Sequence, residues 1–279
     1  MKRLNFFVTI VLIAAMLFNS GCSENAPAKD TMEKTKGNVT ENVTERATEG
    51  ATEGATEGAT EGVVGAESKD GYNPVINPEN YVKVIENPYF PLTPGKTFVY
   101  EGKSEDETIR GETFVTNETR MVIGVNTTVV RDRVFANGKL SEETFDWYAQ
   151  DREGNIWYFG EDSKEYDDGK VAGTAGSWEA GVNGAQPGII MKRNPRVGDI
   201  YRQEYLSGKA EDMAEVISLN ESVSVTYGSF KNCLKTKEWT PLEQGIEEIK
   251  YYASGIGLVL EMGVKGGSEK LELVKITTA

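Results

Sequence analysis

The sequence contains no histidine. Imidazole is the base in Ser-His-Asp and Cys-His catalysis and a common ligand of zinc, copper and iron, so these sites are excluded. Only two cysteines are present, Cys22 and Cys233. Because Cys22 has the separate role described below, we expect no internal disulfide. Cys233 lies in an alternating apolar run, which predicts a buried and unreactive thiol.

Positive charge is also scarce. The chain has 30 Lys and Arg residues against 44 Asp and Glu residues, and its formal net charge is −14. An acidic chain repels the phosphates of nucleic acids, so nucleic-acid binding is not expected. The sequence has neither a P-loop nor a strand-bounded G-x-G-x-x-G pattern, and it has no Ser-x-x-Lys pair. We therefore expect no cofactor.

The first 22 residues have the pattern of an export signal. Lys2 and Arg3 precede a mostly apolar run at 4–18, and Ser20-Gly21-Cys22 follows. This tripeptide resembles the bacterial-type lipobox, although Asn19 stands where an aliphatic residue is usual. We predict a lipoprotein-type signal segment at 1–22 with lipid attached to Cys22. The alternative is an uncleaved anchor, which would be short because a membrane span needs about 20 residues. Both predict an extracytoplasmic, membrane-anchored protein.

Residues 23–72 have the composition of a disordered linker. Ala-Thr-Glu-Gly occurs four times in tandem at 47–62, after two copies of Asn-Val-Thr-Glu at 38–45. Large apolar side chains are nearly absent. Folding would therefore bury too little apolar surface to offset the loss of conformational entropy. A coil of this length spans roughly 40 Å and would hold a single domain, residues 73–279, away from the membrane. Candidate glycosylation sequons begin at Asn38, Asn42, Asn117, Asn126 and Asn220.

Residues 73–279 predict an all-β domain. Dense prolines at 73–95 favour an extended lead-in. Segments rich in Val, Thr and aromatic residues then alternate with short turn signals. The expected strands are 97–102, 108–123 with a break, 127–135, the two arms of a hairpin at 144–162, 200–206, 213–219, 222–227, 233–239, 247–252, 257–264 and 271–277. The only helix candidate is 209–216, where a turn is the alternative. The expected fold is an antiparallel meander that curls into a barrel, half-barrel or sandwich.

The hairpin at 144–162 is the most aromatic stretch of the chain. If Gln150 pairs with Asn155, aromatic side chains lie on both faces, with Gly154 available for a positive φ angle. A half-exposed sheet would show only one apolar face. Either the second face is covered by another segment, or it lines a ligand groove. The glycine-rich segment 163–195 has no strand or helix period, and we expect it to fold back over the hairpin. The candidate groove walls are Trp147, Tyr148, Trp157, Phe159 and Trp178.

Carboxylates near the hairpin are the remaining acid–base groups. The candidates are Asp146, Asp151 and Glu179, with Glu161 close by, and two of them facing each other would suit a glycosidase. Calcium binding is the other option, because 161–162 and 167–169 supply hard oxygen ligands. These stretches do not match a calcium-binding loop, so the sequence predicts solvated acidic turns and no metal site.

Two stretches carry a family resemblance. The first is Y-Y-A-S-G-I-G-L-V at 251–259 after Y-G-S-F-K-N-C-L at 227–234; the second is D-W-Y-A-Q-D at 146–151 with G-S-W-E-A-G at 176–181. They resemble uncharacterised secreted or lipid-anchored proteins of bacteria and archaea with curved antiparallel sheets. The resemblance covers residues 87–264 and implies a fold and a location, but no reaction.

These features together predict a membrane-tethered extracytoplasmic lipoprotein whose β-rich domain binds a lipid, glycan or protein ligand. The alternatives are a carboxylate-based hydrolase and a purely structural surface protein. The membrane is the expected partner through the N-terminal segment.

Overall fold

The structure is a computed structural model, and it describes residues 71–279. The predicted signal segment, Cys22, the repeat linker up to residue 70 and the sequons at Asn38 and Asn42 lie outside the described residues. The strands are β1 (Tyr81–Val82), β2 (Lys96–Ser104), β3 (Glu107–Val122), β4 (Val125–Ala136), β5 (Lys139–Asp151), β6 (Ile156–Asp167), β7 (Lys170–Gly173), β8 (Trp178–Glu179), β9 (Gln186–Met191), β10 (Ile200–Arg202), β11 (Glu204–Tyr205), β12 (Met213–Val225), β13 (Gly228–Trp239), β14 (Glu247–Ala253), β15 (Gly257–Lys265) and β16 (Lys270–Thr278).

The prediction of an all-β antiparallel meander is confirmed. Strands β2 to β6 pair in sequence order, and so do β12 to β16. The last strand, β16, pairs with β2 and joins the two series into one antiparallel sheet. Among residues 71–279 the one helical element is the 3-10 turn η1 (Pro78–Asn80). The same residues contain no helix of the length and apolarity that crossing a membrane requires.

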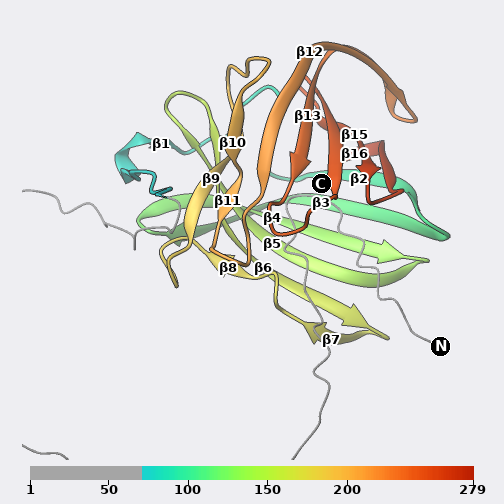
Figure 1. The fold of residues 1–279 in the computed structure, drawn as a ribbon, viewed down its shortest axis with the longest axis horizontal. Coiled ribbons are helices and arrows are strands. Elements are labelled where there is room, and N and C mark those ends of the chain that lie inside the picture. The colour runs from blue at the N-terminus through green and yellow to red at the C-terminus, as the bar shows by residue number, and fades with distance from the viewer. Residues whose placement is uncertain (1–70) are drawn as a thin grey trace, which may run out of the picture. The chain divides into compact units, whose positions relative to one another are not determined.

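The sheet curls until its two ends meet, so it is nearly closed into a barrel. The strand order begins with β10 and ends with β11, and only Gln203 separates these two strands in the chain. Gly188 of β9 makes the approach feasible, because a Cβ at this position would collide with the backbone of Gln203. Figure 1 shows β12 and β13 rising at a steep angle to β4, β5 and β6. Large side chains from both series fill one main core, among them Tyr148, Tyr158, Leu234, Tyr252 and Leu273.

Several predicted strand limits differ from the structure. Strand β3 is continuous, and the expected break is a register irregularity between Val115 and Thr119. The segments 213–219 and 222–227 form one bulged strand, β12. The helix candidate at 209–216 is instead a turn that leads into β12. The segment 163–195, expected to be irregular, contains the end of β6 and the strands β7, β8 and β9.

Candidate functional site

The hairpin β5–β6 is present, but its predicted register is wrong by one residue. Gln150 pairs with Ile156, not with Asn155, and Tyr148 lies opposite Tyr158. The shift arises because Asp151 closes the turn: its carboxylate accepts hydrogen bonds from the Asn155 backbone N–H at 2.8 Å and from the Trp157 indole at 2.9 Å. Gly154 has a φ of 88°, as predicted.

The face that carries Tyr148 and Tyr158 is covered by the segment that follows β6. The two tyrosine rings stack at 4.9 Å, and the Trp178 ring packs edge-on against Tyr158 at 5.2 Å. Strand β8 pairs with β6 at Gly160, where a Cβ would collide with the backbone of Trp178. The glycine at this position therefore lets the covering segment approach the hairpin.

The aromatic residues named as candidate groove walls lie mainly in the core. Trp147, Tyr148, Phe159 and Trp178 are buried, and Trp157 is partly buried. The guanidinium of Arg120 lies 4.1 Å from the centre of the Trp147 ring. These rings form packing contacts on both faces of the hairpin, which accounts for the aromatic residues on each.

The three candidate carboxylates lie in separate surroundings. Asp146 is buried in the interior, whereas Asp151 is engaged in the hairpin turn. Glu179 forms an ion pair with Arg120 at 2.6 Å, and both side chains are partly exposed. Among the sequons, Asn117, Asn126 and Asn220 are exposed. Cys233 is a free thiol and is buried, as predicted, and burial raises its pKa.

Asp146 belongs to a larger set of carboxylates on the inner face of the curled sheet, which we call the acidic belt. One group, the first carboxylate cluster, lies on β4, β5, β6 and β11. Its members are Asp132, Asp146, Glu161 and Glu204, and all four are buried. Another group, the second carboxylate cluster, lies on β13, β14, β15 and immediately before β16. Its members are Glu238, Glu248, Glu261 and Glu269.

The two clusters belong to one continuous interior. Asp212, just before β12, interacts electrostatically with Glu204 of the first cluster and with Glu248 of the second. Tyr100 of β2 likewise interacts electrostatically with Asp132 of the first cluster and with Glu261 of the second. The belt therefore follows the sheet around its inner face.

Burial dominates the chemistry of the first carboxylate cluster. It raises the pKa of Asp132 to about 7, and it raises the pKa of Asp146 well above the usual range, with the Asp132 charge adding to the effect. Burial and the Glu204 charge likewise raise the pKa of Glu161. The Tyr158 hydroxyl donates to Asp146 Oδ1 at 2.7 Å, and the carboxyl groups of Asp146 and Asp132 share a hydrogen bond, whereas Glu161 Oε1 has no hydrogen-bond partner. Burial therefore favours the protonated, neutral form of these acids.

The second carboxylate cluster surrounds Lys250, the one buried cationic side chain among residues 71–279. Its ammonium lies 2.8 Å from Glu238 and 3.7 Å from Glu248. Burial lowers the pKa of Lys250, but the negative charges of Glu238 and Glu261 outweigh this effect, and the pKa rises well above its usual value. Glu238 also accepts hydrogen bonds from the hydroxyls of Thr236 and Tyr252, so it is the member with a complete set of partners.

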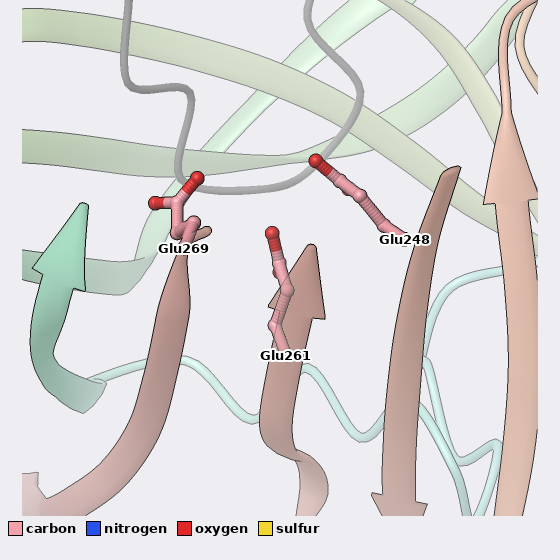
Figure 2. Close-up of side chains that lie close together, drawn as sticks. All are labelled: Glu248, Glu261 and Glu269. Atoms are coloured by element: carbon pink, nitrogen blue, oxygen red, sulfur yellow. The ribbon is translucent and has the colours of Figure 1, made fainter. Parts of the chain in front are cut away.

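The other three members of the second cluster point toward one another (Figure 2). One oxygen from each of Glu248, Glu261 and Glu269 lies within 4.8 Å of the other two. Burial raises the pKa of Glu261, and it raises that of Glu269 to about 8. Carboxylate oxygens without nitrogen or sulfur ligands suit hard cations such as Ca²⁺ and Mg²⁺.

The belt could have been noticed from the strand period, but sequence reasoning missed all of it except Asp146 and Glu161. In β4, Asp132 lies in phase with the buried Val130 and Val134. In β15, Glu261 lies in phase with the buried Val259. A carboxylate at an apolar phase of an alternating strand is the signal that identifies an inward-facing acid.

Comparisons with known proteins show likeness to solved structures only. No family model matches the chain, and no curated protein matches it. One similar structure is a predicted exported protein with a YmcC-like fold from Bacteroides fragilis: it is 17% identical, with a TM-score of 0.43, over 68% of this chain and 99% of that chain. Another is a predicted lipoprotein from Parabacteroides distasonis: it is 14% identical, with a TM-score of 0.38, over the same shares of the two chains. These identities and TM-scores are too low to support an argument about function. The function is therefore inferred from the residues of this chain alone.

Proposed function

We propose that this protein is a membrane-tethered, extracytoplasmic binding protein whose curled sheet takes up a cationic ligand at the acidic belt. The observation that carries the proposal is that, within residues 71–279, the buried carboxylates outnumber the buried cationic side chains, of which Lys250 is the one present. A cation is the ligand class that would neutralise this excess.

The energetic argument starts from the cost of burying charge. Proteins rarely bury acidic groups unless they are paired, hydrogen-bonded or coordinated to a metal. In the belt, Asp132 and Asp146 hydrogen-bond to each other and not to a cation, and Glu161 Oε1 is buried without a hydrogen-bond partner. Clusters of buried acids with strongly shifted pKa values are typical of functional sites. A core built for stability alone would favour apolar side chains at these positions.

The location is inferred from the N-terminal sequence. The charged start, the apolar run and Ser20-Gly21-Cys22 support export and lipid attachment, and the repeats at 47–62 support a spacer. Replacement of Cys22 by serine should abolish incorporation of labelled fatty acid and release the protein from the membrane fraction.

An apolar or glycan ligand and a hydrolase have less support. The aromatic rings that would line an apolar or glycan groove are mostly buried within the core. Of the carboxylates that would form a hydrolase pair, Asp151 closes the hairpin turn and Glu179 pairs with Arg120, whereas Asp146 and Glu161 lie opposite each other but are buried in the interior. A cationic ligand therefore fits the inner face best.

A cation panel tests the proposal. The full chain is purified from membranes in detergent, and its unfolding temperature is measured with Ca²⁺, Mg²⁺, a polyamine, neutral sugars and lipids. We expect at least one cation to raise the unfolding temperature, and Glu161→Gln to reduce this rise. The matched control is Asp162→Asn, because Asp162 is the neighbouring residue and pairs with Lys164 at the surface. No response to any cation, or a co-purifying neutral ligand found by native mass spectrometry, would overturn the proposal.

A further inference from the structure

The sheet geometry brings three glutamates to one place. Glu248 of β14 lies opposite Gly263 of β15, and the Gly263 backbone N–H donates to the carbonyl of Glu269 at 2.9 Å. Glu261 precedes Gly263 by two residues, so it lies on the same face of β15. Glu248 and Glu269 therefore flank a residue without a side chain, and Glu261 lies next to the space this leaves.

Gly263 is needed for this arrangement. A Cβ at this position would lie 3.1 Å from the carbonyl carbon of Gly267, in the loop that leads to Glu269. This is closer than a Cβ normally packs, so a larger residue would push the loop away. The glycine thus lets the loop approach β15 and bring Glu269 beside Glu248 and Glu261.

The carboxylate of Glu261 has no hydrogen-bond partner within the protein, although Glu261 lies opposite Lys250 of β14 and interacts with its charge. Its side chain is 1% exposed, and neither of its oxygens makes a hydrogen bond. Glu269 Oε1 is also buried without a partner. Unpaired buried carboxylate oxygens are costly unless they are protonated or bind a cation, and oxygens that converge on one point suit a bound cation.

Lys250 does not satisfy this requirement. Its ammonium is closest to Glu238, at 2.8 Å, and it is 3.7 Å from Glu248. One ammonium faces four carboxylates of the second cluster, so ionised Glu248, Glu261 and Glu269 would leave a surplus of negative charge. A divalent ion would offset most of that surplus.

The spacing and chemistry fit Ca²⁺. Oxygens bound to one Ca²⁺ at about 2.3–2.6 Å from it are separated by up to about 5 Å, and the glutamate oxygens lie within 4.8 Å of one another. Glu248 and Glu269 are only partly buried, so an ion can enter from their side while Glu261 forms the floor of the site. Water would complete the coordination sphere, as is common for Ca²⁺.

We infer that Glu248, Glu261 and Glu269 form a Ca²⁺ site that links β14, β15 and the start of β16. The inference rests on the proposed function and narrows it to one ion and three residues of the acidic belt. With three carboxylate ligands, the expected dissociation constant is on the order of 10⁻⁴ to 10⁻³ M, the range of extracellular calcium modules.

The test is calcium titration of the full chain in detergent by isothermal calorimetry, together with thermal unfolding in calcium and in chelator. We expect Glu261→Gln to weaken calcium binding by at least about tenfold. In chelator, the same variant should unfold at the same temperature as the wild type or higher, because it removes like-charge repulsion. In saturating calcium, the wild type should instead unfold at a higher temperature than Glu261→Gln. The control is Glu247→Gln, on the same strand as Glu248 but paired with Lys265, which should bind calcium like the wild type.

The outcomes separate the two proposals. If Glu261→Gln lowers the unfolding temperature equally with and without calcium, the glutamates have a structural role beside Lys250, and the calcium site is refuted. If calcium binding survives Glu261→Gln but is lost in Glu161→Gln, the ion lies in the first carboxylate cluster: the proposed function stands and this inference fails. If no cation binds any variant, both fail.

Discussion

Replacement of Trp178 by alanine tests whether β8 seals the interior over the β5–β6 hairpin. The Trp178 side chain is 5% exposed and packs edge-on against Tyr158 at 5.2 Å. Removing a buried tryptophan ring costs about 3–5 kcal/mol of unfolding free energy. For a domain of about 200 residues, each kcal/mol corresponds to about 2–4 °C, so the unfolding temperature should fall by about 6–20 °C.

Circular dichroism is the suitable assay, because the substitution removes a fluorophore. Trp239→Ala is the control: Trp239 is partly exposed, with the Lys237 ammonium 4.9 Å from the ring centre. Losing that cation–π contact should cost about 0.5–1 kcal/mol, with some lost packing in addition. Trp178→Phe should recover much of the stability, since it keeps an aromatic ring. A loss below about 1 kcal/mol for Trp178→Ala, outside the range for buried tryptophan, would refute the view that this ring is part of the core.

Three further predictions concern the belt, the turn and the closure of the sheet. Burial raises the pKa of Asp132 to about 7, so the folded state binds more protons than the unfolded state between about pH 4 and pH 7. Cation-free protein should therefore lose about 2–4 kcal/mol of unfolding free energy as the pH rises through this window, and urea titrations should show a shallower slope for Asp132→Asn. Asp151→Ala removes the acceptor of the Asn155 and Trp157 N–H groups and should cost about 1–3 kcal/mol in urea unfolding, whereas an unchanged midpoint would contradict its role in the turn. Gly188→Ala forces a Cβ into the backbone of Gln203 and should cost about 3 kcal/mol or more, while wild-type stability would mean that β9 and the β10–β11 junction do not meet so closely.

Strand positions followed from local chemistry and could be predicted. Alternating Val, Thr and aromatic residues marked β2 to β4 and β14 to β16 within two residues of their ends, whereas β5, β6 and β13 each extend five residues beyond the predicted limits and β12 joins two predicted strands. Asn137-Gly138, a dipeptide typical of hairpin turns, has positive φ values of 50° and 78° and joins β4 to β5. These features depend on neighbouring residues in the chain, which is why one sequence suffices to find them.

Register and long-range pairing could not be predicted, because they depend on distant or side-chain contacts. The hairpin register shifts by one residue through the hydrogen bonds that Asp151 accepts. Strand β9 has no clear period, and its position depends on pairing with β6 and β11. The junction of β16 with β2 joins segments from opposite ends of the domain.

The acidic belt was missed because charged side chains on strands are normally assigned to the solvent face. Glu238 and Glu261 lie instead in phase with buried apolar residues, and Glu269 lies in a loop before β16. Only the curling of the sheet brings these groups together with Asp132 and Asp146, so their sequence separation gave no sign of proximity.

The most direct test of a cation-binding interior is X-ray diffraction from crystals of the protein grown in calcium, with data collected at a long wavelength to enhance anomalous scattering. We predict an anomalous difference peak between the carboxylates of Glu248, Glu261 and Glu269, within about 2.3–2.6 Å of one oxygen from each. Well-ordered crystals with no such peak at any part of the belt, and with the Lys250 ammonium between these glutamates, would contradict the account.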